Sequence, residues 1–234
     1  MSNTIETIGL SFSYGRNHVL NCLSMHVPKG SIFGLLGCNG AGKSTTLKLL
    51  LGLLPSKKGK ITFFGESNYG PEIFYRIGNL IESPSYYEYM TVEEHLKMLN
   101  IIYKMPELRI NEVLAMTSLT NEKNKKASNL STGLKQRLGI AIALFHDPEL
   151  LILDEPMNGL DPLAIIDIRN LLLKLQQEGK TILFSSHIIS EMEKLCTHIG
   201  IISEGKMIHE GAVDNIENRD IEGFYISILR SEKH

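Results

Sequence analysis

The chain has 234 residues, with 24 lysines and arginines against 26 aspartates and glutamates, so its formal net charge is −2. This slightly acidic balance argues against a protein dedicated to nucleic acid, which normally presents a basic face. The three cysteines are odd in number and lack metal-ligand spacing, which favours a reducing compartment over a disulfide scaffold.

The N-terminal stretch MSNTIETIGL is polar and carries Glu6, which is not the pattern of a signal peptide. The longest apolar runs are broken by charge or proline before they reach the ~20 residues of a membrane-spanning helix. We therefore expect a protein that is soluble on its own, built as one α/β unit with a substantial core.

Short strands alternate with helices in the first part of the chain. Residues 31–36 (SIFGLL) form an apolar run that predicts a buried strand, and residues 43–54 carry leucines at helical spacing up to Pro55. The runs GKITFFG and RIGNLIE predict two further strands, 59–65 and 76–82.

Helical periodicity replaces the strands between residues 84 and 148. The first helix opens at TVEEHLKMLNIIYKM, where Thr91 followed by Glu94 forms a capping box. RINEVLAMTSL and GLKQRLGIAIALF continue the helical pattern. This stretch predicts a helical subdomain inserted into the α/β unit.

Strands return after the insertion. ELLILDEP and TILFSSH are continuous apolar runs, typical of a parallel sheet covered on both faces, and a helix over 162–178 connects them. HIGIISEGKMIHEG predicts a hairpin that turns at Glu204 and Gly205. The residues from Ala212 onward are weakly patterned and receive no predicted element.

The loop GCNGAGKST, between the first buried strand and its helix, has the pattern of a phosphate-binding loop. Its glycines let backbone N–H groups point at phosphate oxygens, and the helix N-terminus adds positive potential. Lys43 is expected to reach the terminal phosphates, and Ser44 to offer its hydroxyl to Mg²⁺. We expect the nucleotide at Gly37, Cys38, Asn39, Gly40, Ala41, Gly42, Lys43, Ser44 and Thr45.

Titratable side chains follow two other predicted strands. Asp154 and Glu155 stand beyond the end of LLILDEP, where α/β sheets bind ligands. Asp154 suits Mg²⁺, through water, and Glu155 suits polarising an attacking water; a helix N-cap pair before Pro156 is the alternative. His187, after TILFSSH, is a candidate γ-phosphate contact or an ordinary loop histidine.

A second stretch also suits an anion. NLSTGLKQRLGIAIAL, residues 129–144, places a loop of small residues before an amphipathic helix. Ser131 can donate its hydroxyl, and Gly133 can expose its N–H. The chain thus has two phosphate-binding stretches, although one nucleotide needs only one of them.

The order of these motifs resembles the nucleotide-binding subunit of ABC transporters over nearly the whole chain. GCNGAGKST, NLSTGLKQR, LLILDEP, NGLD and His187 follow one another as in that family. The resemblance implies an ATPase whose signature motif, residues 130–134, binds the ATP of an opposing subunit. It also implies that Asp161 lies across that interface and that Tyr14 stacks on adenine, unless Tyr14 is a plain strand residue.

The resemblance further implies partners and a location. ATP and Mg²⁺ are the expected ligands, and a second nucleotide-binding subunit, as a homodimer, is the expected partner. Integral membrane permease subunits are the other expected partners, and they would hold the protein at the cytoplasmic face of the cell membrane. Nucleic acid is not expected.

The implied fold class is α/β, a P-loop NTPase (RecA-like) core with a parallel sheet, an N-terminal antiparallel β subdomain and an inserted α-helical subdomain. The whole chain is a single domain. Its core and β subdomain take residues 1–82 and 148–211, the helical signature subdomain takes 83–147, and the C-terminal tail takes 212–234.

The sequence departs from the family pattern at two places. Thr132 and Leu134 replace a glycine and the glutamine of the usual signature, Leu-Ser-Gly-Gly-Gln. Glu82 stands where most relatives have glutamine; we expect it to bind Mg²⁺, as a hard oxygen ligand, and to tune catalysis and its coupling to the membrane partner. A neutral exchange of glutamine for glutamate is the alternative.

Glu82 and the stretch IESPSYYEYMTVEEHL resemble the subgroup that exports lantibiotics and bacitracin-like peptides for self-protection. The aromatic cluster Tyr86, Tyr87 and Tyr89, with Met90, is expected either to dock the membrane subunit or to pack on its own subdomain. Cys38 is an unusual residue in the phosphate-binding loop, where a bulky thiol reagent is expected to block ATP binding.

The sequence therefore predicts an ATP-hydrolysing subunit of a membrane exporter, with Glu155, His187 and Glu82 in catalysis. Export of another substrate, such as a lipid, an ion or a polysaccharide, stays open. A soluble ATPase of the same superfamily is a rival, although such proteins usually carry two cassettes or a coiled-coil insertion. A nucleotide-gated interaction protein without turnover is disfavoured by the presence of both Glu155 and His187.

Overall fold

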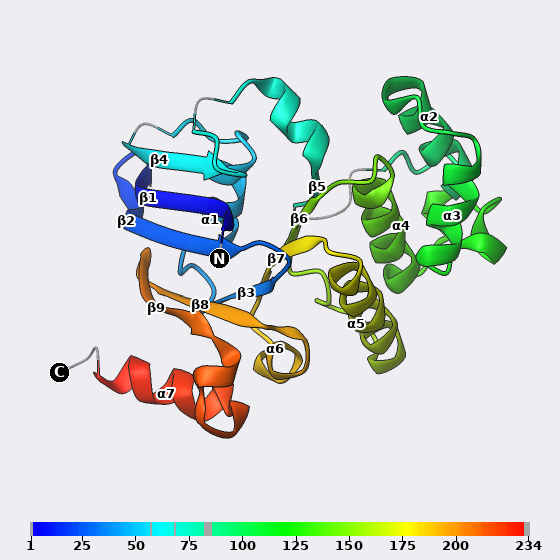
Figure 1. Ribbon diagram of the computed structural model, residues 1–234. Coiled ribbons are helices and arrows are strands. Elements are labelled where there is room, and N and C mark those ends of the chain that lie inside the picture. Colours follow the sequence, from blue (N-terminus) through cyan, green and yellow to red (C-terminus); the bar gives the residue numbers. More distant parts are fainter. Residues whose placement is uncertain (1, 57, 68, 82–85, 232–234) are drawn as a thin grey trace.

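The computed structural model describes residues 2–56, 58–67, 69–81 and 86–231. It has three parts: a small antiparallel sheet, a larger sheet flanked by helices, and a helical lobe (Figure 1). This arrangement confirms the α/β class, with the antiparallel β subdomain and the inserted helical subdomain that the sequence predicts.

The larger sheet has six strands in the order β5-β6-β7-β3-β8-β9. The strands from β5 to β8 in this order are parallel, and β9 pairs antiparallel with β8. Their bounds are β3 Ile32–Leu36, β5 Ile77–Leu80, β6 Leu150–Asp154, β7 Thr181–Ser186, β8 His198–Ser203 and β9 Lys206–Ala212. The antiparallel sheet, in the order β2-β1-β4, consists of β1 Asn3–Tyr14, β2 Asn17–Pro28 and β4 Lys58–Phe63.

The helices predicted from periodicity are present. The α-helices are α1 Lys43–Leu50, α2 Val92–Tyr103, α3 Leu108–Met116, α4 Thr132–Leu144, α5 Pro162–Gln177, α6 Ile189–Leu195 and α7 Ile221–Ser231. The capping box of α2 forms as expected, with Thr91 Oγ1 accepting the Glu94 N–H and Glu94 Oε2 accepting the Thr91 N–H. Helix α1 is shorter than predicted, because the chain turns away through Gly52 at φ +68°.

The C-terminal residues, which the sequence left without an element, form short 3₁₀ turns and then α7. Ile221 of α7 is buried, and Phe224, Tyr225 and Ile228 pack against the main core. This apolar spacing of three and four residues is the signal of an amphipathic helix. Helix α7 therefore belongs to the folded unit.

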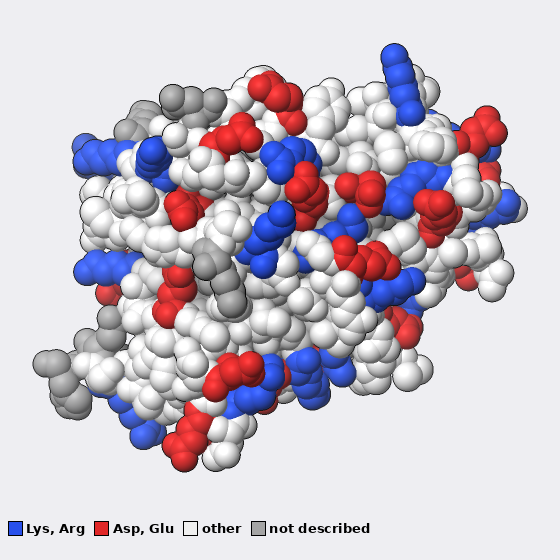
Figure 2. Space-filling model, in the orientation of Figure 1, with Lys and Arg blue, Asp and Glu red and all other residues white. Residues whose placement is uncertain are grey.

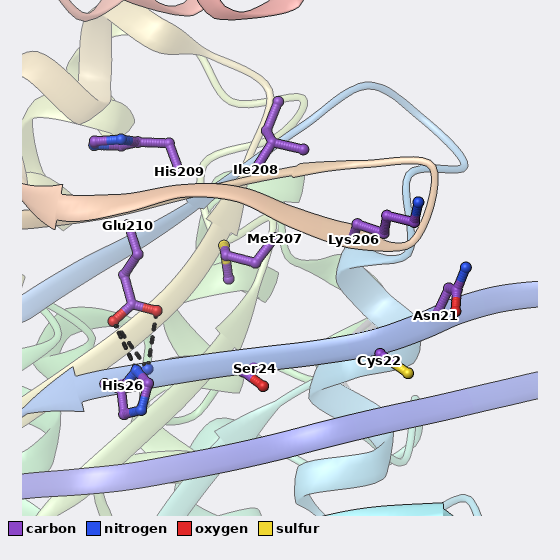
Figure 3. Close-up of a pocket in the computed structure, with 9 residues that line it drawn as sticks. All are labelled: Asn21, Cys22, Ser24, His26, Lys206, Met207, Ile208, His209 and Glu210. Atoms are coloured by element: carbon purple, nitrogen blue, oxygen red, sulfur yellow. Dashed lines mark hydrogen bonds and ion pairs between the residues drawn. The ribbon is translucent and has the colours of Figure 1, made fainter. Parts of the chain in front are cut away.

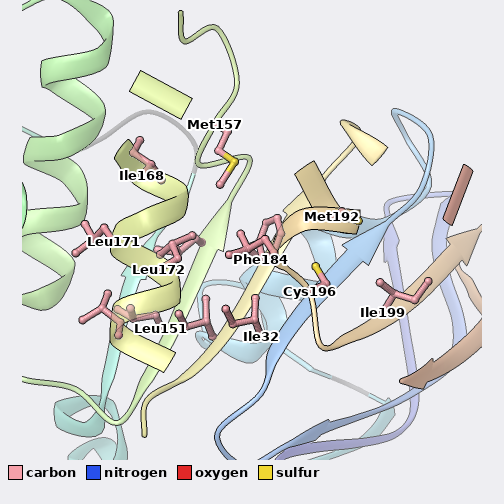
Figure 4. Packing of buried hydrophobic residues seen from close by; sticks show 14 of the residues in the cluster. Ile32, Leu151, Met157, Ile168, Leu171, Leu172, Phe184, Met192, Cys196 and Ile199 are labelled. Carbon is pink, nitrogen blue, oxygen red and sulfur yellow. The ribbon is translucent and has the colours of Figure 1, made fainter. Parts of the chain in front are cut away.

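The larger sheet is buried on both faces, which explains the continuous apolar runs of its strands. Ile182 and Phe184 of β7 pack with α5 and α6, whereas Leu183 packs with α1 and the antiparallel sheet. Figure 4 shows the first of these clusters, to which Leu172 of α5 and Met192 of α6 belong. A separate cluster fills the helical lobe. Alternate residues of each strand thus have defined partners, which fixes the register.

Charged side chains on the face shown in Figure 2 are interspersed, with acidic beside basic groups rather than a field of one sign. Several charged side chains of the protein are ion-paired, for example Arg76 with Glu149 and Lys180 with Asp147, each at 2.7 Å. Exposed pairs contribute roughly 0–1 kcal/mol each. The stability of the fold therefore rests mainly on its apolar clusters.

One ion pair is largely buried and joins α5 to α6. Arg169 donates to Glu191 through Nε (2.8 Å to Oε2) and through Nη2 (3.0 Å to Oε1), and the Glu191 side chain is 7% exposed. A bidentate pair of this kind fixes direction as well as distance. The relative position of the two helices therefore depends on it.

We expect Glu191→Ala to lower the free energy of unfolding by about 3 kcal/mol, because the Arg169 guanidinium loses its carboxylate while staying largely buried. Urea unfolding followed by circular dichroism measures this. Lys194→Ala is the matched control: Lys194 Nζ lies 3.5 Å from the same carboxylate, but its side chain is 54% exposed. Its loss should cost less than about 1 kcal/mol. Equal losses in both variants would contradict the prediction.

Candidate functional site

The phosphate-binding loop, residues 37–42, connects the carboxyl end of β3 to α1. Gly40 and Gly42 have φ angles of +82° and +112°, a region that glycine adopts most easily. A Cβ at Gly42 would also lie 2.6 Å from Leu20 Cδ2 and 3.2 Å from the Val19 carbonyl oxygen, so a side chain there would require its neighbours to shift. The glycines thus let the loop N–H groups and the first turn of α1 face one space.

Lys43 reaches back over this loop. Its side chain is 6% exposed, and Nζ donates to the carbonyl oxygens of Gly37 (2.7 Å) and Cys38 (3.3 Å). Nζ also lies 3.7 Å from Glu155 Oε1. A fixed cation beside a loop of N–H groups makes this edge of the sheet attractive to phosphate.

Asp154 and Glu155 come at the end of β6, and Ser185 of the neighbouring strand β7 holds both of them. The buried Ser185 hydroxyl donates to Asp154 Oδ1 and accepts the N–H of Glu155 (2.9 Å). Glu155 has a φ of 48°, which is uncommon for a residue with a side chain. The bond from Ser185 therefore fixes the direction in which the Glu155 side chain leaves the backbone.

The Glu155 carboxylate lies between two nitrogen-bearing side chains. Its Oε2 contacts Nδ1 of His187 at 2.9 Å, and its Oε1 faces Lys43. The structure thus brings together three residues that come from three separate sequence motifs. His187 is 44% exposed, so its ring can also meet a ligand.

A hollow of about 410 Å³ opens over these groups. It is lined by Asn39, Gly40, Gly42, Lys43, Ser44 and Thr45 on one side and by Glu155 and His187 on the other. Tyr14 lies at its rim, 47% exposed and edge-on to Phe12 at 4.9 Å between ring centroids. The hollow is of the size that small-molecule sites have.

Sequence reasoning missed several residues of this site. Asn17 and Val19, at the start of β2, also line the hollow, as does Asn158. The available signal was proximity in sequence to Tyr14 for Asn17 and Val19, whereas Asn158 is the first residue of the motif NGLD, of which only Asp161 had been assigned to the site. Ser185 was missed as well; the available signal was the pair of hydroxyls, Ser185 and Ser186, that ends an apolar run.

The second stretch that the sequence predicts to bind phosphate, residues 129–144, lies in the helical lobe. Ser131 is exposed and caps α4, where its Oγ accepts the N–H of Leu134 at 3.4 Å. Gly133 lies beside α5, and a Cβ there would be 3.4 Å from that of Ala164. Among the described residues, the lining of the hollow over Lys43 does not include Ser131 or Gly133. The two stretches therefore do not share one hollow within the chain.

Three other expected site residues have distinct positions. Asp161 is exposed and caps α5, with Oδ1 accepting the Ala164 N–H at 2.9 Å. The exposed Cys38 side chain turns toward α7, where Sγ lies 3.3 Å from the Tyr225 hydroxyl. Glu82, expected at Mg²⁺, falls outside the described residues.

The aromatic cluster before α2 divides between the two expected roles. Tyr86 packs against the apolar cluster of the helical lobe. Tyr87 and Tyr89 are 50% and 69% exposed, and their ring centroids are 5.7 Å apart. Part of the cluster is therefore available at the surface.

A larger hollow, of about 680 Å³, lies between the edge strands β2 and β9 (Figure 3). Asn21 N–H donates to the Gly205 carbonyl (2.9 Å) at one end, and Glu210 accepts the N–H of His26 (3.1 Å) at the other. Burial raises the pKa of Glu210, against the lowering effect of its contacts with His26. These contacts join the antiparallel sheet, which carries Tyr14, to the larger sheet.

A buried lysine over a glycine-rich loop, with two carboxylates and a histidine at the ends of neighbouring parallel strands, defines a P-loop nucleoside triphosphatase. The sequence pattern of the ABC transporter family matches residues 20–158, which is more than half of the chain. The chain belongs to this family and is an ATP-binding, ATP-hydrolysing subunit of an ABC transporter.

Curated relatives resemble the chain over most of its length. It is 45% identical to the bacitracin transport ATP-binding protein BcrA of Bacillus licheniformis, over 94% of this chain and 73% of that protein. It is 42% identical to the lantibiotic transport ATP-binding protein SrtF of Streptococcus pyogenes, over 89% of this chain and 91% of that protein.

Solved structures support the fold. An ATP-binding subunit of an ABC transporter superimposes with a TM-score of 0.86 at 30% identity, covering 97% of this chain and 99% of that one. The cbiO1 subunit from Clostridium perfringens superimposes with a TM-score of 0.84 at 28% identity. The match covers 100% of this chain and 97% of that one. In the part of the chain that the structure describes, none of the helices combines the length and apolarity needed to cross a membrane.

We expect Ser185→Ala to lower kcat for ATP hydrolysis roughly tenfold, because a partner that orients functional carboxylates typically changes activity 10- to 100-fold. Thr181→Val is the matched control, since it removes a buried hydroxyl from the opposite end of β7. Steady-state phosphate release measures both variants. A similar kcat for Ser185→Ala and Thr181→Val would contradict the orienting role.

Proposed function

We propose that this protein powers the export of an antimicrobial peptide of the bacitracin or lantibiotic kind, as a means of self-protection. The observation that carries the proposal is the 42–45% identity to ATP-binding proteins of bacitracin and lantibiotic transport, over about nine-tenths of the chain. The presence of Glu82 in IESPSYYEYMTVEEHL, where most relatives have glutamine, is a second support.

In this proposal, ATP lies in the hollow over the phosphate-binding loop. The loop N–H groups and Lys43 bind the β- and γ-phosphates, and Tyr14 at the rim stacks on adenine. Glu155 orients the attacking water, and His187 contacts the γ-phosphate. The contact between Glu155 and His187, at 2.9 Å, supports this division because it holds the two groups together in the lining of the hollow.

The donor atoms at this edge fit a magnesium ion. Ser44 lines the hollow, and the Asp154 carboxylate is at the strand end, 6% exposed, with one oxygen bonded to Ser185. Mg²⁺ prefers oxygen ligands and usually takes only one or two from the protein, with the rest from water and phosphate. We assign Ser44, Asp154 and Glu82 to it. When bound, the ion neutralises charge on the phosphates.

Two such subunits pair head to tail in this proposal, and the signature motif of each binds the ATP of the other. Ser131 is exposed at the positive end of α4, a helix of 13 residues, which favours an external anion. Asp161 is exposed at the start of α5 and is assigned to the same interface. The second phosphate-binding stretch would thus serve the partner's nucleotide.

The membrane subunit is proposed to dock beside the helical lobe. A groove of about 260 Å³ lies between the strand β5 and helices α2 and α4, and its lining includes Phe74, Leu80, Leu99, Tyr103 and Ile142. Tyr75, 59% exposed, lies edge-on to Tyr103. A groove with apolar side chains in its lining and an exposed tyrosine beside it suits an amphipathic helix. Docking there would place the protein at the cytoplasmic face of the cell membrane.

The roles at the hollow are tested with Glu155→Gln. We expect ATP to bind with unchanged affinity, turnover to fall roughly 10²- to 10⁴-fold, and a stable dimer to form with Mg·ATP, because the carboxylate that orients water is gone. Phosphate release and size-exclusion chromatography measure these. Glu149→Gln, at the other end of β6, is the control and should keep wild-type turnover. Wild-type-like turnover in Glu155→Gln would overturn the role.

The substrate class is tested in cells that produce the protein with its membrane subunits. We expect Lys43→Ala, which removes the phosphate-binding cation, to raise susceptibility to a bacitracin or lantibiotic peptide. Minimal inhibitory concentrations measure this, with an antibiotic that acts inside the cell as the comparison compound. Unchanged susceptibility to both peptide classes, with ATP hydrolysis abolished, would refute peptide export and leave the ATPase assignment intact.

A further inference from the structure

Helix α7 is fixed to the core on several sides. Ile221 is buried, and Phe224 lies edge-on to the ring of His209 on β9, at 4.6 Å between centroids. Just before the helix, Arg219 donates to the carbonyl of Cys196 at 3.0 Å. The helix therefore has a defined position relative to the larger sheet (Figure 1).

From that position α7 contacts the phosphate-binding loop. The Tyr225 hydroxyl lies 3.3 Å from Cys38 Sγ, across 187 positions of sequence. Burial and the contact with Cys38 raise the pKa of Tyr225 to about 12, so its phenol stays protonated near neutral pH and can donate to the sulfur. The contact joins an element that sequence analysis left unassigned to the loop expected to bind ATP.

Cys38 is a residue on which the loop conformation depends. Its carbonyl accepts the Ala41 N–H at 3.1 Å, which closes the turn of the loop, and it also accepts from Lys43 Nζ at 3.3 Å. Its side chain meets α7 on the outside of that turn. A restraint on the Cys38 side chain is therefore a restraint on the backbone that would face the phosphates.

A second connection links α7 to the other side of the site. Glu193 of α6 accepts the N–H of Glu222 at 3.4 Å, and α6 begins two residues after His187. The phosphate-binding loop and the helix that follows His187 thus both contact α7. This helix is placed to hold the two sides of the hollow relative to each other.

We propose that Tyr225 is a positioning residue for ATP binding, which holds the phosphate-binding loop through Cys38. Tyr225 acts without touching the nucleotide, because the described lining of the hollow includes neither Tyr225 nor Cys38. The inference rests on the proposed assignment of residues 37–45 to the phosphates. It adds the C-terminal helix to the set of elements that determine nucleotide affinity.

The test is a double-mutant cycle on the full chain, with Kd for a fluorescent ATP analogue measured in the presence of magnesium. Tyr225→Phe removes the hydroxyl and keeps the ring, and it should raise Kd roughly threefold, as the loss of one ordinary hydrogen bond does. Cys38→Ala should raise Kd by a similar factor. The double variant should bind no more weakly than either single variant, because both remove the same contact.

Two controls separate positioning from general destabilisation. Ser227→Ala removes a hydroxyl from the same helix, where it donates to the Phe224 carbonyl at 2.7 Å, and should leave Kd unchanged. The melting temperature of Tyr225→Phe should stay within about 3 °C of the wild type, and kcat at saturating ATP should not change. A shift in melting temperature with unchanged Kd would make Tyr225 merely structural and overturn the proposal.

The remaining outcomes are equally decisive. The proposed contact would be overturned if the double variant raised Kd by the product of the two single-variant factors. An unchanged or lower Kd in Tyr225→Phe would overturn it as well. Lys43→Ala serves as the reference for the site itself. If it abolishes nucleotide binding while Tyr225→Phe has no effect, only the positioning role fails. If Lys43→Ala binds as the wild type does, the assignment of the loop to the phosphates fails.

Discussion

The parallel pairing of β3, β6 and β7 is the constraint on which the rest of the structure depends. Leu36 pairs with Ser186, and Asp154 pairs with Ser185, so the three strands end at the same level. Because parallel strands present their carboxyl ends at one edge, the phosphate-binding loop and the loops after β6 and β7 open into one hollow. The apolar clusters on both faces maintain this register, and a slip of one residue would turn Asp154 to the opposite face.

Charge at this edge is consistent with the proposed role of Glu155, which is to orient water rather than to bind phosphate. Lys43 is nearly buried, and its ammonium is compensated by two loop carbonyls and by the Glu155 carboxylate. A phosphate about 4 Å from Glu155 would meet a repulsion of roughly 4 kcal/mol at an effective dielectric near 20, and a similar attraction from Lys43. Because the loop N–H groups add to the attraction of Lys43, the proposed place for phosphate is on the loop side of the hollow.

Much of this arrangement could be predicted from the sequence, because the strands are buried on both faces and so carry uninterrupted apolar runs. The capping box at Thr91 and the turn at Glu204 and Gly205 also follow from local chemistry and are present. The position of α7 could not be predicted. Its apolar residues at positions 221, 224, 225 and 228 indicate an amphipathic helix but not the surface that it covers, and the contact of Tyr225 with Cys38 joins distant parts of the chain.

One of the contacts between the helical lobe and the core is with α5, the helix that begins beside the hollow. Arg137 of α4 is ion-paired with Asp167 of α5, and Gly133 lies close to Ala164 of the same helix. Helix α5 starts directly after Asp161, three residues beyond Asn158, which lines the hollow. Under the proposed pairing, a force on the signature motif from a partner's nucleotide would reach α5 through these contacts. Helix α5 is in turn held to α6 by the buried ion pair of Arg169 and Glu191. A movement of α5 would therefore also move the loop of His187, which directly precedes α6.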